Sequence, residues 1–213
     1  MWNPAFRKAA EQRGWRLETL AKGACPVMDL PITNPLRRLL EQFQHCEQWR
    51  AEILARLRAE PPRLVVVSMW RGYGADESLT GFDAYGGAWL ESLTRLVQEL
   101  RDTGAEVLVL GPVPDPQSAV PICLSGHLDD VAACSPSRQV AVDEDGIAAE
   151  AAATEAGGGQ YVDVTELFCT TKRCPVIVGN TLVYFDRYHL TIEYSRLLEP
   201  VVGTLTDRAL AAG

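Results

Sequence analysis

Asp186 and His189 carry the clearest chemical signal in the sequence. They stand three residues apart in LVYFDRYHLT, residues 182–191, after an apolar run and before an amphipathic segment. A carboxylate that binds one imidazole nitrogen fixes the tautomer of a histidine and leaves the other nitrogen able to accept a proton. A tight turn at a strand end can bring a residue and its i+3 neighbour within hydrogen-bond reach. We therefore predict that His189 is a general base oriented by Asp186.

The chain contains no obvious nucleophile for this base. It has no Gly-x-Ser-x-Gly elbow and no Gly-rich phosphate loop. Ser68 and Ser125 lie near plausible site loops, but neither has the supporting turn. The alternative interpretation makes Asp186 a surface residue and His189 the N-cap of the last helix.

The six cysteines fall in three neighbouring pairs, which are Cys25 with Cys46, Cys123 with Cys134, and Cys169 with Cys174. Each pair flanks or lies in a loop rich in Pro, Gly, Ser or Thr, which favours disulfides and an oxidising compartment. Six cysteines permit many connectivities, and sequential pairing is the one that we predict. Free buried thiols are one alternative. A metal site that includes His127 is another, although a Cys-x3-His spacing without a second close Cys-x2-Cys is weak for zinc.

The composition limits the class of protein and its partners. A chain of 213 residues with 47% hydrophobic and 23% charged residues is long enough for one α/β domain. A net charge of −8 argues against a nucleic-acid partner. No stretch approaches the ~18 apolar residues of a membrane span, and no signal peptide is visible. The cysteines nevertheless favour a location outside the cytoplasm. An upstream membrane domain would explain how a chain without a visible signal peptide reaches that location.

The sequence alternates between helix and strand patterns. We predict helices over 3–13, with Asn3 as N-cap and Gly14 at the stop, and over 34–60, 84–103 and 143–159. A terminal helix begins at Thr191 and is kinked near Pro200. We predict strands over 15–21, 63–70, 106–114, 160–164 and 181–185, and a loop over 115–138. Buried strands that alternate with helices indicate a mostly parallel sheet with helices on both faces. Sites in such folds lie beyond the carboxyl ends of the strands, where 68–74, 111–116 and 186–189 should converge.

Several segments in this order resemble the SGNH (GDSL-type) hydrolase superfamily. They are KGACP, VVVSMW, GPVPDP followed by a cysteine, and ELFCTTKRCPVIVGNTLVYF ahead of DRYHLT. The likeness is to the SGNH domains fused to membrane acyltransferases that O-acylate bacterial surface polysaccharides. It implies a single domain over 1–213 with a three-layer α/β/α, flavodoxin-like fold. Family members open with a strand that ends in Gly-Asp-Ser-His, whereas MWNPAF matches only from the Trp onward. The resemblance therefore implies an N-terminally truncated domain whose first strand and serine precede Met1.

The resemblance also implies a chemistry. In the family a serine attacks an ester and forms an acyl-enzyme, with roles for His189 and Asp186 as base and orienter. Gly23 stands at the position of an oxyanion-hole glycine, or is a plain turn residue. The family's asparagine after the next strand is absent, and Ser68, Trp70 and Arg71 take its place as candidate substrate contacts. Trp70 would stack on a sugar ring or pack in the core, and Arg71 has an equally plausible role as a surface charge.

We therefore expect a carbohydrate O-acyl esterase or O-acyltransferase domain without a cofactor or metal. Its expected partners are an acylated or acceptor carbohydrate and an upstream membrane acyltransferase domain, at the extracytoplasmic face of a bacterial membrane. The first alternative is a catalytically inactive remnant that at most binds carbohydrate. The second is an esterase that uses another serine of the chain.

Overall fold

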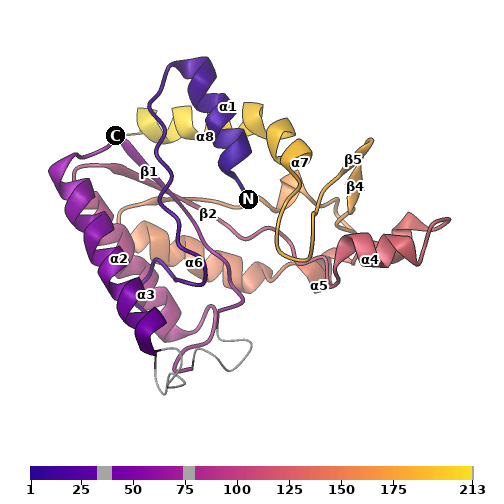
Figure 1. The fold of residues 1–213 in the computed structure, drawn as a ribbon, viewed down its shortest axis with the longest axis horizontal. Helices are drawn as coiled ribbons and strands as arrows, with labels where there is room; N and C mark the ends of the chain where they lie inside the picture. The colour runs from indigo at the N-terminus through magenta and orange to yellow at the C-terminus, as the bar shows by residue number, and fades with distance from the viewer. Residues whose placement is uncertain (33–39, 74–79, 213) are drawn as a thin grey trace. The chain divides into compact units, whose positions relative to one another are not determined.

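The computed structural model describes residues 1–32, 40–73 and 80–212 (Figure 1). It divides into two compact units. Unit 1 comprises Met1–Thr19, Val113–Asp143 and Val164–Arg208. Unit 2 comprises Leu20–Pro112, Glu144–Asp163 and Ala209–Gly213. No helix within the described residues is long and apolar enough to cross a lipid bilayer. The single domain expected from the sequence stays a prediction.

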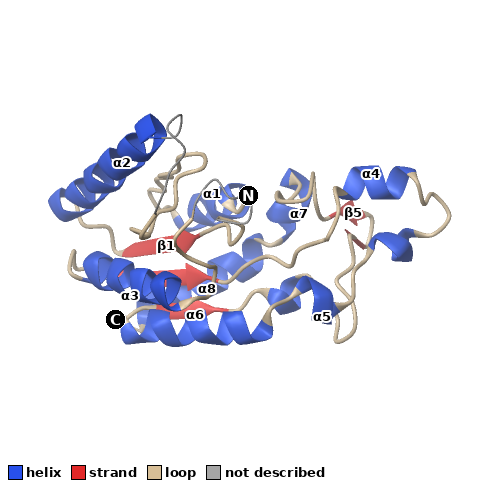
Figure 2. Ribbon diagram, turned by 90° about the horizontal axis from the view of Figure 1, so that it is seen from below, coloured by secondary structure: helices blue, strands red, loops and turns tan. Residues whose placement is uncertain are grey.

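Unit 2 contains a parallel three-stranded sheet (Figure 2). Its strands, in the spatial order β1-β2-β3, are Leu64–Ser68, Glu106–Leu110 and Gln160–Val162. Val66 lies opposite Leu108, and Val109 lies opposite Tyr161. All five residues of β2 are buried or nearly so, as expected of a central strand covered on both faces. The predicted α/β fold with a parallel sheet is confirmed, whereas the three-layer arrangement involves both units and stays a prediction.

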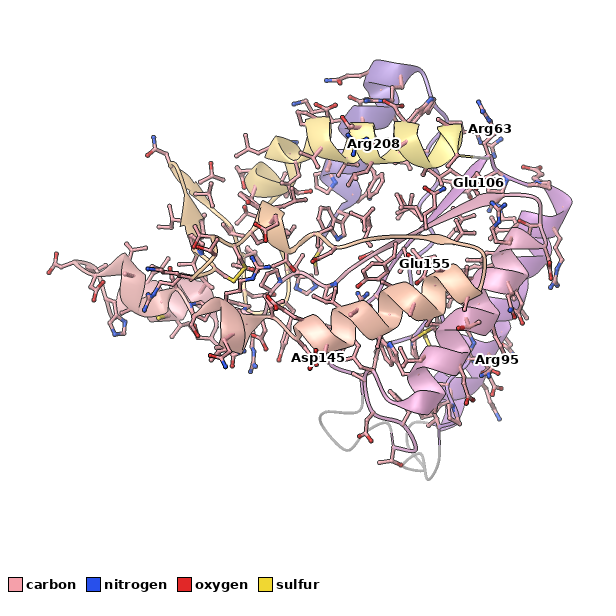
Figure 3. All side chains as sticks on the ribbon, turned by 180° about the vertical axis from the view of Figure 1, so that it is seen from behind. Arg63, Arg95, Glu106, Asp145, Glu155 and Arg208 are labelled. Carbon is pink, nitrogen blue, oxygen red and sulfur yellow. A yellow bond between two sulfur atoms is a disulfide. The ribbon has the colours of Figure 1, made fainter. Side chains whose placement is uncertain are left out.

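Three long helices belong to unit 2, namely α2 (Leu40–Ala59), α3 (Gly87–Arg101) and α6 (Glu144–Ala156). The apolar face predicted for α3 is confirmed, because Trp89, Leu93, Leu96, Val97 and Leu100 are all buried. Helices α3 and α6 pack against each other and against the sheet, and Figure 3 shows Asp145 and Glu155 near opposite ends of α6. The predicted beginning of α2 at residue 34 lies outside the described residues.

Glycines allow a close approach where α6 ends. A Cβ at Gly157 or at Gly159 would lie 2.7 Å from side-chain atoms of Val97. Real side chains do not tolerate such a distance, so the glycines that the sequence places after α6 have a packing role. They allow the chain to turn from α6 into β3 directly beside α3.

Unit 1 contains the N-terminal helix, most of the C-terminal helix and several short elements between them in the sequence. They are α1 (Asn3–Arg13), α4 (Val120–Ser125), a 3₁₀ turn at Val131–Cys134, α5 (Arg138–Ala141), a 3₁₀ turn at Thr165–Leu167, β4 (Ile177–Val178), β5 (Thr181–Leu182), α7 (Ile192–Leu197) and α8 (Glu199–Ala211), whose last residues belong to unit 2. Helix α1 packs on α7, where the backbone N–H of Ala5 donates to Ser195 Oγ at 3.3 Å. Trp2 meets the ring of Phe168 edge-on at 6.1 Å.

The structure corrects several predicted boundaries. Trp2, and not Asn3, is the N-cap of α1, and the side-chain oxygen of Asn3 is buried without a partner in the described structure. Gly14 ends α1 with a left-handed φ of 64°, as predicted. The break between α7 and α8 at Leu198 confirms the kink predicted near Pro200.

Three predicted segments differ more substantially. The loop over 115–138 contains α4, the 3₁₀ turn and the start of α5. The strand over 181–185 is a short antiparallel hairpin with β4. The strand over 15–21 is not formed, because no described strand pairs with it, and its large apolar side chains Trp15, Leu17 and Leu20 are left exposed. An alternating pattern is necessary for a half-buried strand, but hydrogen bonds to a neighbour are required as well.

The predicted cysteine pairing is confirmed at all three positions. Cys25–Cys46 lies in unit 2, and Cys123–Cys134 and Cys169–Cys174 lie in unit 1. Their sequence separations are 21, 11 and 5 residues, so each disulfide closes a local loop. Each removes conformational freedom from the unfolded chain.

Candidate active site

The segment Asp186–His189 forms a closed turn in unit 1. Tyr184 and Leu190 form an antiparallel bridge across its base, and the backbone N–H of Phe185 donates to the carbonyl of His189 at 2.8 Å. These bonds bring the two ends of the turn together. The turn therefore holds residues 186 and 189 side by side, as their spacing predicted.

The carboxylate of Asp186 organises the interior of the turn. Its Oδ1 accepts hydrogen bonds from the backbone N–H groups of Tyr188 at 2.6 Å and His189 at 2.7 Å. Its Oδ2 lies 2.8 Å from Nδ1 of His189. Because an ionised carboxylate only accepts hydrogen bonds, Nδ1 carries a proton and Nε2 of the neutral imidazole is the acceptor. This is the tautomer that a general base requires.

Electrostatics keep Asp186 ionised. Partial burial by itself raises the pKa of the Asp186 carboxyl, but the bonds from the Tyr188 N–H and from the side chain and N–H of His189 together lower it below its ordinary value. The side chains of Asp186 and His189 are 39% and 62% exposed, so the imidazole is open to a ligand. The arrangement can accept a proton from a hydroxyl and stabilise the resulting imidazolium.

The alternative role of His189 as a helix N-cap is not what the structure contains. The N-cap of α7 is Thr191, whose side-chain oxygen accepts a hydrogen bond from the N–H of Tyr194 at 3.1 Å. His189 precedes it and is bound to Asp186 instead. The helix is thus capped without the imidazole, which leaves His189 available for chemistry.

Gly23 and Ser68 belong to unit 2. Ser68 is the exposed last residue of β1, at the carboxyl end where a site in a parallel sheet is expected. Gly23 lies in a turn, and a Cβ built there would meet no atom within 4 Å. The left-handed residue of that turn is Ala24, with a φ of 57°. Backbone geometry and packing therefore do not by themselves require glycine at position 23.

Trp70 follows β1 and is 40% exposed. Its ring meets Tyr73 edge-on, with centroids 5.2 Å apart. The indole also lies directly over Gly72, where a Cβ would be only 2.2 Å from Trp70 Cζ2. A glycine neighbour and an aromatic neighbour thus hold an exposed aromatic surface in place.

Arg71 turns inward from the same loop. Its guanidinium forms a two-point pair with Glu150, at 3.1 Å from Nε to Oε1 and 2.6 Å from Nη2 to Oε2. It also donates to the backbone carbonyls of Met69 and Leu110. Arg71 therefore connects the loop after β1 to the end of β2 and to α6.

Sequence reasoning missed the rest of this buried network. Glu150 accepts hydrogen bonds from Trp89 Nε1 at 2.8 Å and from the Tyr161 hydroxyl at 3.2 Å, and it is fully buried. Burial, and then the Glu150 charge, raise the pKa of Tyr161. One signal was available, because Glu150 falls at helical spacing with Ile147 and Ala153 on the buried face of α6. Its partner cannot be read from that pattern.

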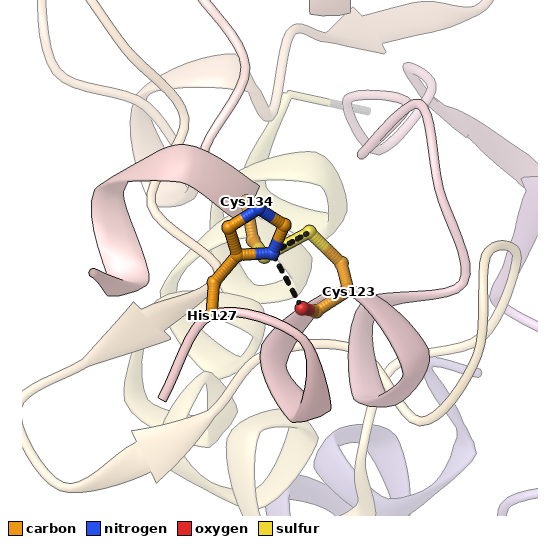
Figure 4. Close-up of side chains that lie close together, drawn as sticks. All are labelled: Cys123, His127 and Cys134. Carbon is orange, nitrogen blue, oxygen red and sulfur yellow. Dashed lines mark hydrogen bonds between the residues drawn. A yellow bond between two sulfur atoms is a disulfide. The ribbon is translucent and has the colours of Figure 1, made fainter. Parts of the chain in front are cut away.

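The loop closed by Cys123 and Cys134 contains the group considered as a metal site (Figure 4). Nδ1 of His127 lies 3.8 Å from both sulfur atoms and 2.9 Å from the carbonyl oxygen of Cys123. The two sulfurs are bonded to each other, however, and a metal needs thiolates. The disulfide interpretation of this pair is the one that the structure supports.

Comparison with known proteins adds context to this geometry. A family model described as an SGNH domain fused to AT3 domains matches residues 1–204. The solved periplasmic domain of a lipopolysaccharide acetyltransferase from Salmonella ser. Paratyphi A is similar in fold, with a TM-score of 0.74 and 15% identity. The match covers 97% of this chain and 78% of that one. A search of the curated proteins found no match by sequence.

Proposed function

Because the chain belongs to the family of SGNH domains fused to AT3 domains, we propose that it acts as a carbohydrate O-acyl esterase or O-acyltransferase domain. The observation that carries the proposal is the 2.8 Å contact between Asp186 Oδ2 and His189 Nδ1. It supplies an oriented base inside a domain whose family is associated with acyltransferases. The proposed reaction is acyl transfer through a serine-bound acyl-enzyme.

In the proposed mechanism the serine is contributed by a strand that precedes Met1 in the complete domain. His189 Nε2 takes the serine proton as the Oγ–carbonyl bond forms, and Asp186 stabilises the imidazolium. The proton then passes to the departing oxygen of the donor ester, which leaves an acyl-serine. A carbohydrate hydroxyl or water then gives its proton to His189 and attacks the acyl-serine carbonyl. The acyl–Oγ bond breaks, His189 returns the proton to the serine oxygen, and the acceptor carries the acyl group away.

We also propose roles for the other candidate residues. We assign the Gly23 N–H to the oxyanion hole and Ser68 to substrate contact. We assign the exposed ring of Trp70 to stacking on a sugar. The contacts of Arg71 with Glu150 and two carbonyls support an indirect role for Arg71, in which it holds the loop that presents Trp70 to the substrate.

The proposed partners follow from the comparisons. The Salmonella neighbour is a lipopolysaccharide acetyltransferase domain, and by analogy we propose a surface carbohydrate as acceptor and an upstream membrane acyltransferase domain as the source of the acyl group. The periplasmic origin of that neighbour and the three disulfides fit an extracytoplasmic location. The net charge of −8 disfavours nucleic acid as a partner.

A serine-directed fluorophosphonate probe tests the proposal. The domain is expressed with the segment encoded immediately upstream of Met1, and peptide mass spectrometry identifies the labelled residue. We expect a serine in that segment to be labelled and the label to be lost in H189A. In D186N the rate of labelling should fall by roughly 10⁴, the usual effect of losing the carboxylate that orients a triad histidine.

Two other outcomes decide between the remaining interpretations. Labelling of a serine within residues 1–213 would favour an esterase with a different nucleophile. No labelling, together with a native protein whose N-terminal sequence begins at Met1, would favour the inactive remnant. Such a remnant would retain carbohydrate binding that is lost in W70A.

A further inference from the structure

We propose that Arg187 and Asp115 form a positioning pair that fixes the Asp186–His189 turn relative to the loop after residue 113. Arg187 lies inside the turn, and Asp115 lies in the segment GPVPDP of the same unit. The term positioning rests on the proposed function of His189. The geometry itself does not depend on that function.

The contact between the two side chains is a two-point one. Arg187 Nη2 lies 2.9 Å from Asp115 Oδ2, and Arg187 Nε lies 3.3 Å from Asp115 Oδ1. Both side chains are about two-fifths exposed, so the pair contributes little to the stability of the fold. Two parallel bonds between planar groups nevertheless restrict orientation, which a single contact does not.

Asp115 is itself held in place. Its backbone N–H donates to the carbonyl of Ala141 at 2.9 Å, and its Oδ1 accepts a bond from the N–H of Gln117 at 2.7 Å. Gln117 has a left-handed φ of 65°, an uncommon conformation for a residue other than glycine. The carboxylate of Asp115 thus reinforces a defined turn and gives Arg187 a fixed anchor.

Movement of Arg187 would be transmitted to the imidazole. The Arg187 guanidinium lies 5.7 Å from the ring centroid of Tyr188, and the N–H of Tyr188 is one of the donors that hold Asp186. Asp186 in turn holds His189. A chain of contacts therefore connects Asp115 with the residue that orients the base.

A second tether keeps the fold intact without this pair. The buried Tyr184 hydroxyl donates to the carbonyl of Pro114 at 2.9 Å and joins the base of the turn to the same loop. Burial raises the pKa of Tyr184, so the hydroxyl stays protonated and keeps donating. Loss of the Arg187 contact should thus loosen the turn without unfolding unit 1.

Nuclear magnetic resonance of the 213-residue chain tests the inference without an activity assay. The protein has three histidines, and H189Q identifies the Nδ1–H signal of His189. The hydrogen-exchange rate of that proton is measured in the parent, R187M, R187K and D115N. The matched control is R13M, because Arg13 makes a similar two-point contact with Asp207 in the same unit, away from the turn.

In R187M we expect exchange of the Nδ1 proton to accelerate roughly five-fold, the factor for about 1 kcal/mol of lost orientation. R187K should restore part of the protection because it keeps the charge and loses the planar fork. R13M should leave the exchange rate of the Nδ1 proton at its parent value, and R187M should melt within about 3 °C of the parent. Equal exchange rates in R187M and R13M would overturn the inference.

Kinetics of the complete domain separate this inference from the proposed function. If the domain transfers acyl groups, R187M should lower kcat and leave KM nearly unchanged, because a positioning residue acts on the base and not on substrate binding. A domain with no acyl-transfer activity would refute the proposed function and leave the exchange result to decide on the pair. An exchange effect without a change in kcat would refute the positioning role alone.

Discussion

The Asp186–His189 pair of unit 1 and the Arg71–Glu150 pair of unit 2 differ in almost every physical respect. In unit 1, Asp186 and His189 are three residues apart, and their side chains are 39% and 62% exposed. In unit 2, Arg71 and Glu150 are 79 residues apart, and their side chains are 9% and 0% exposed. The first pair is made by a local turn and remains open to a ligand. The second is made by tertiary packing and is closed to solvent.

This difference separates an orienting role from a structural one. An exposed pair keeps most of its hydration and contributes at most about 1 kcal/mol to stability, so its value lies in the tautomer and direction that it imposes. A buried pair has lost its hydration, and each charge depends on the other and on its remaining hydrogen bonds. Glu150 has such bonds from Trp89 and Tyr161, and Arg71 has them to two carbonyls.

Removing one member of the buried pair should have the largest effect on stability. Glu150→Ala leaves the Arg71 guanidinium without its counter-ion and should lower the free energy of unfolding by about 3–5 kcal/mol. Urea titration measures the change. The double variant R71M/E150L, which replaces both charges with apolar groups, should recover much of the loss. A loss below about 1 kcal/mol in E150A would mean that the two pairs are energetically alike.

The sequence predicted the Asp186–His189 pair, whose members are close together in the chain. It did not predict the Arg71–Glu150 pair, whose members are far apart in the chain. The Asp186–His189 turn, the apolar face of α3 and the three cysteine pairs all depend on spacings within one segment. Such spacings can be read from the sequence, because the periods of strands and helices and the length of short loops determine which nearby residues come into contact.

What the sequence did not reveal depends on partners far along the chain. The residues 15–21 alternate as a strand does, yet no described strand pairs with them. The two-residue β5 pairs with β4 and not with the parallel sheet. The sequence does not distinguish Glu150 from the other acidic residues. Its contacts with Arg71, Trp89 and Tyr161 appear only in the folded structure. Local pattern limits what a segment can be, and tertiary contacts decide which option is realised.

An intermediate effect is expected where Arg71 holds its loop. Gly72→Ala places a Cβ 2.2 Å from Trp70 Cζ2, so the indole must leave its position. We expect a loss of about 1–3 kcal/mol in the free energy of unfolding, typical of overpacking, and a shift in tryptophan fluorescence. Chemical denaturation followed by fluorescence measures both.

The matched control for this glycine is Gly23→Ala. A Cβ at position 23 meets nothing within 4 Å, and the variant should be neutral or slightly stabilising. The double variant W70A/G72A should be no less stable than W70A, because the obstructed ring is gone. If G72A and G23A behave alike, the indole is not held over Gly72, and the aromatic surface that we propose for sugar stacking is not preformed.

The smallest effect on the free energy of unfolding should come from the exposed Asp186–His189 pair. The pH dependence of that effect identifies the group that causes it. Hydrogen bonds hold the folded-state pKa of Asp186 below its ordinary value of 3.8. A depressed carboxyl pKa contributes stability that is fully present above the ordinary pKa and is lost as the pH falls through the folded-state pKa. The difference in unfolding free energy between the parent and D186N should therefore be under about 1 kcal/mol near neutral pH, and it should decline below about pH 4.

The variant His189→Gln tests whether the imidazole or the backbone N–H groups cause this loss of stability at low pH. The N–H groups of residues 188 and 189 remain in that variant, and the hydrogen bond from the Tyr188 N–H is the largest single contribution that lowers the pKa of Asp186. We therefore expect H189Q to keep most of the stability loss below about pH 4, because backbone donors still favour the ionised carboxylate. Urea titrations at several pH values measure it. If H189Q abolished the acid dependence, Asp186 would be held by the imidazole instead of by the turn, and the exposed pair would orient itself without help from the backbone.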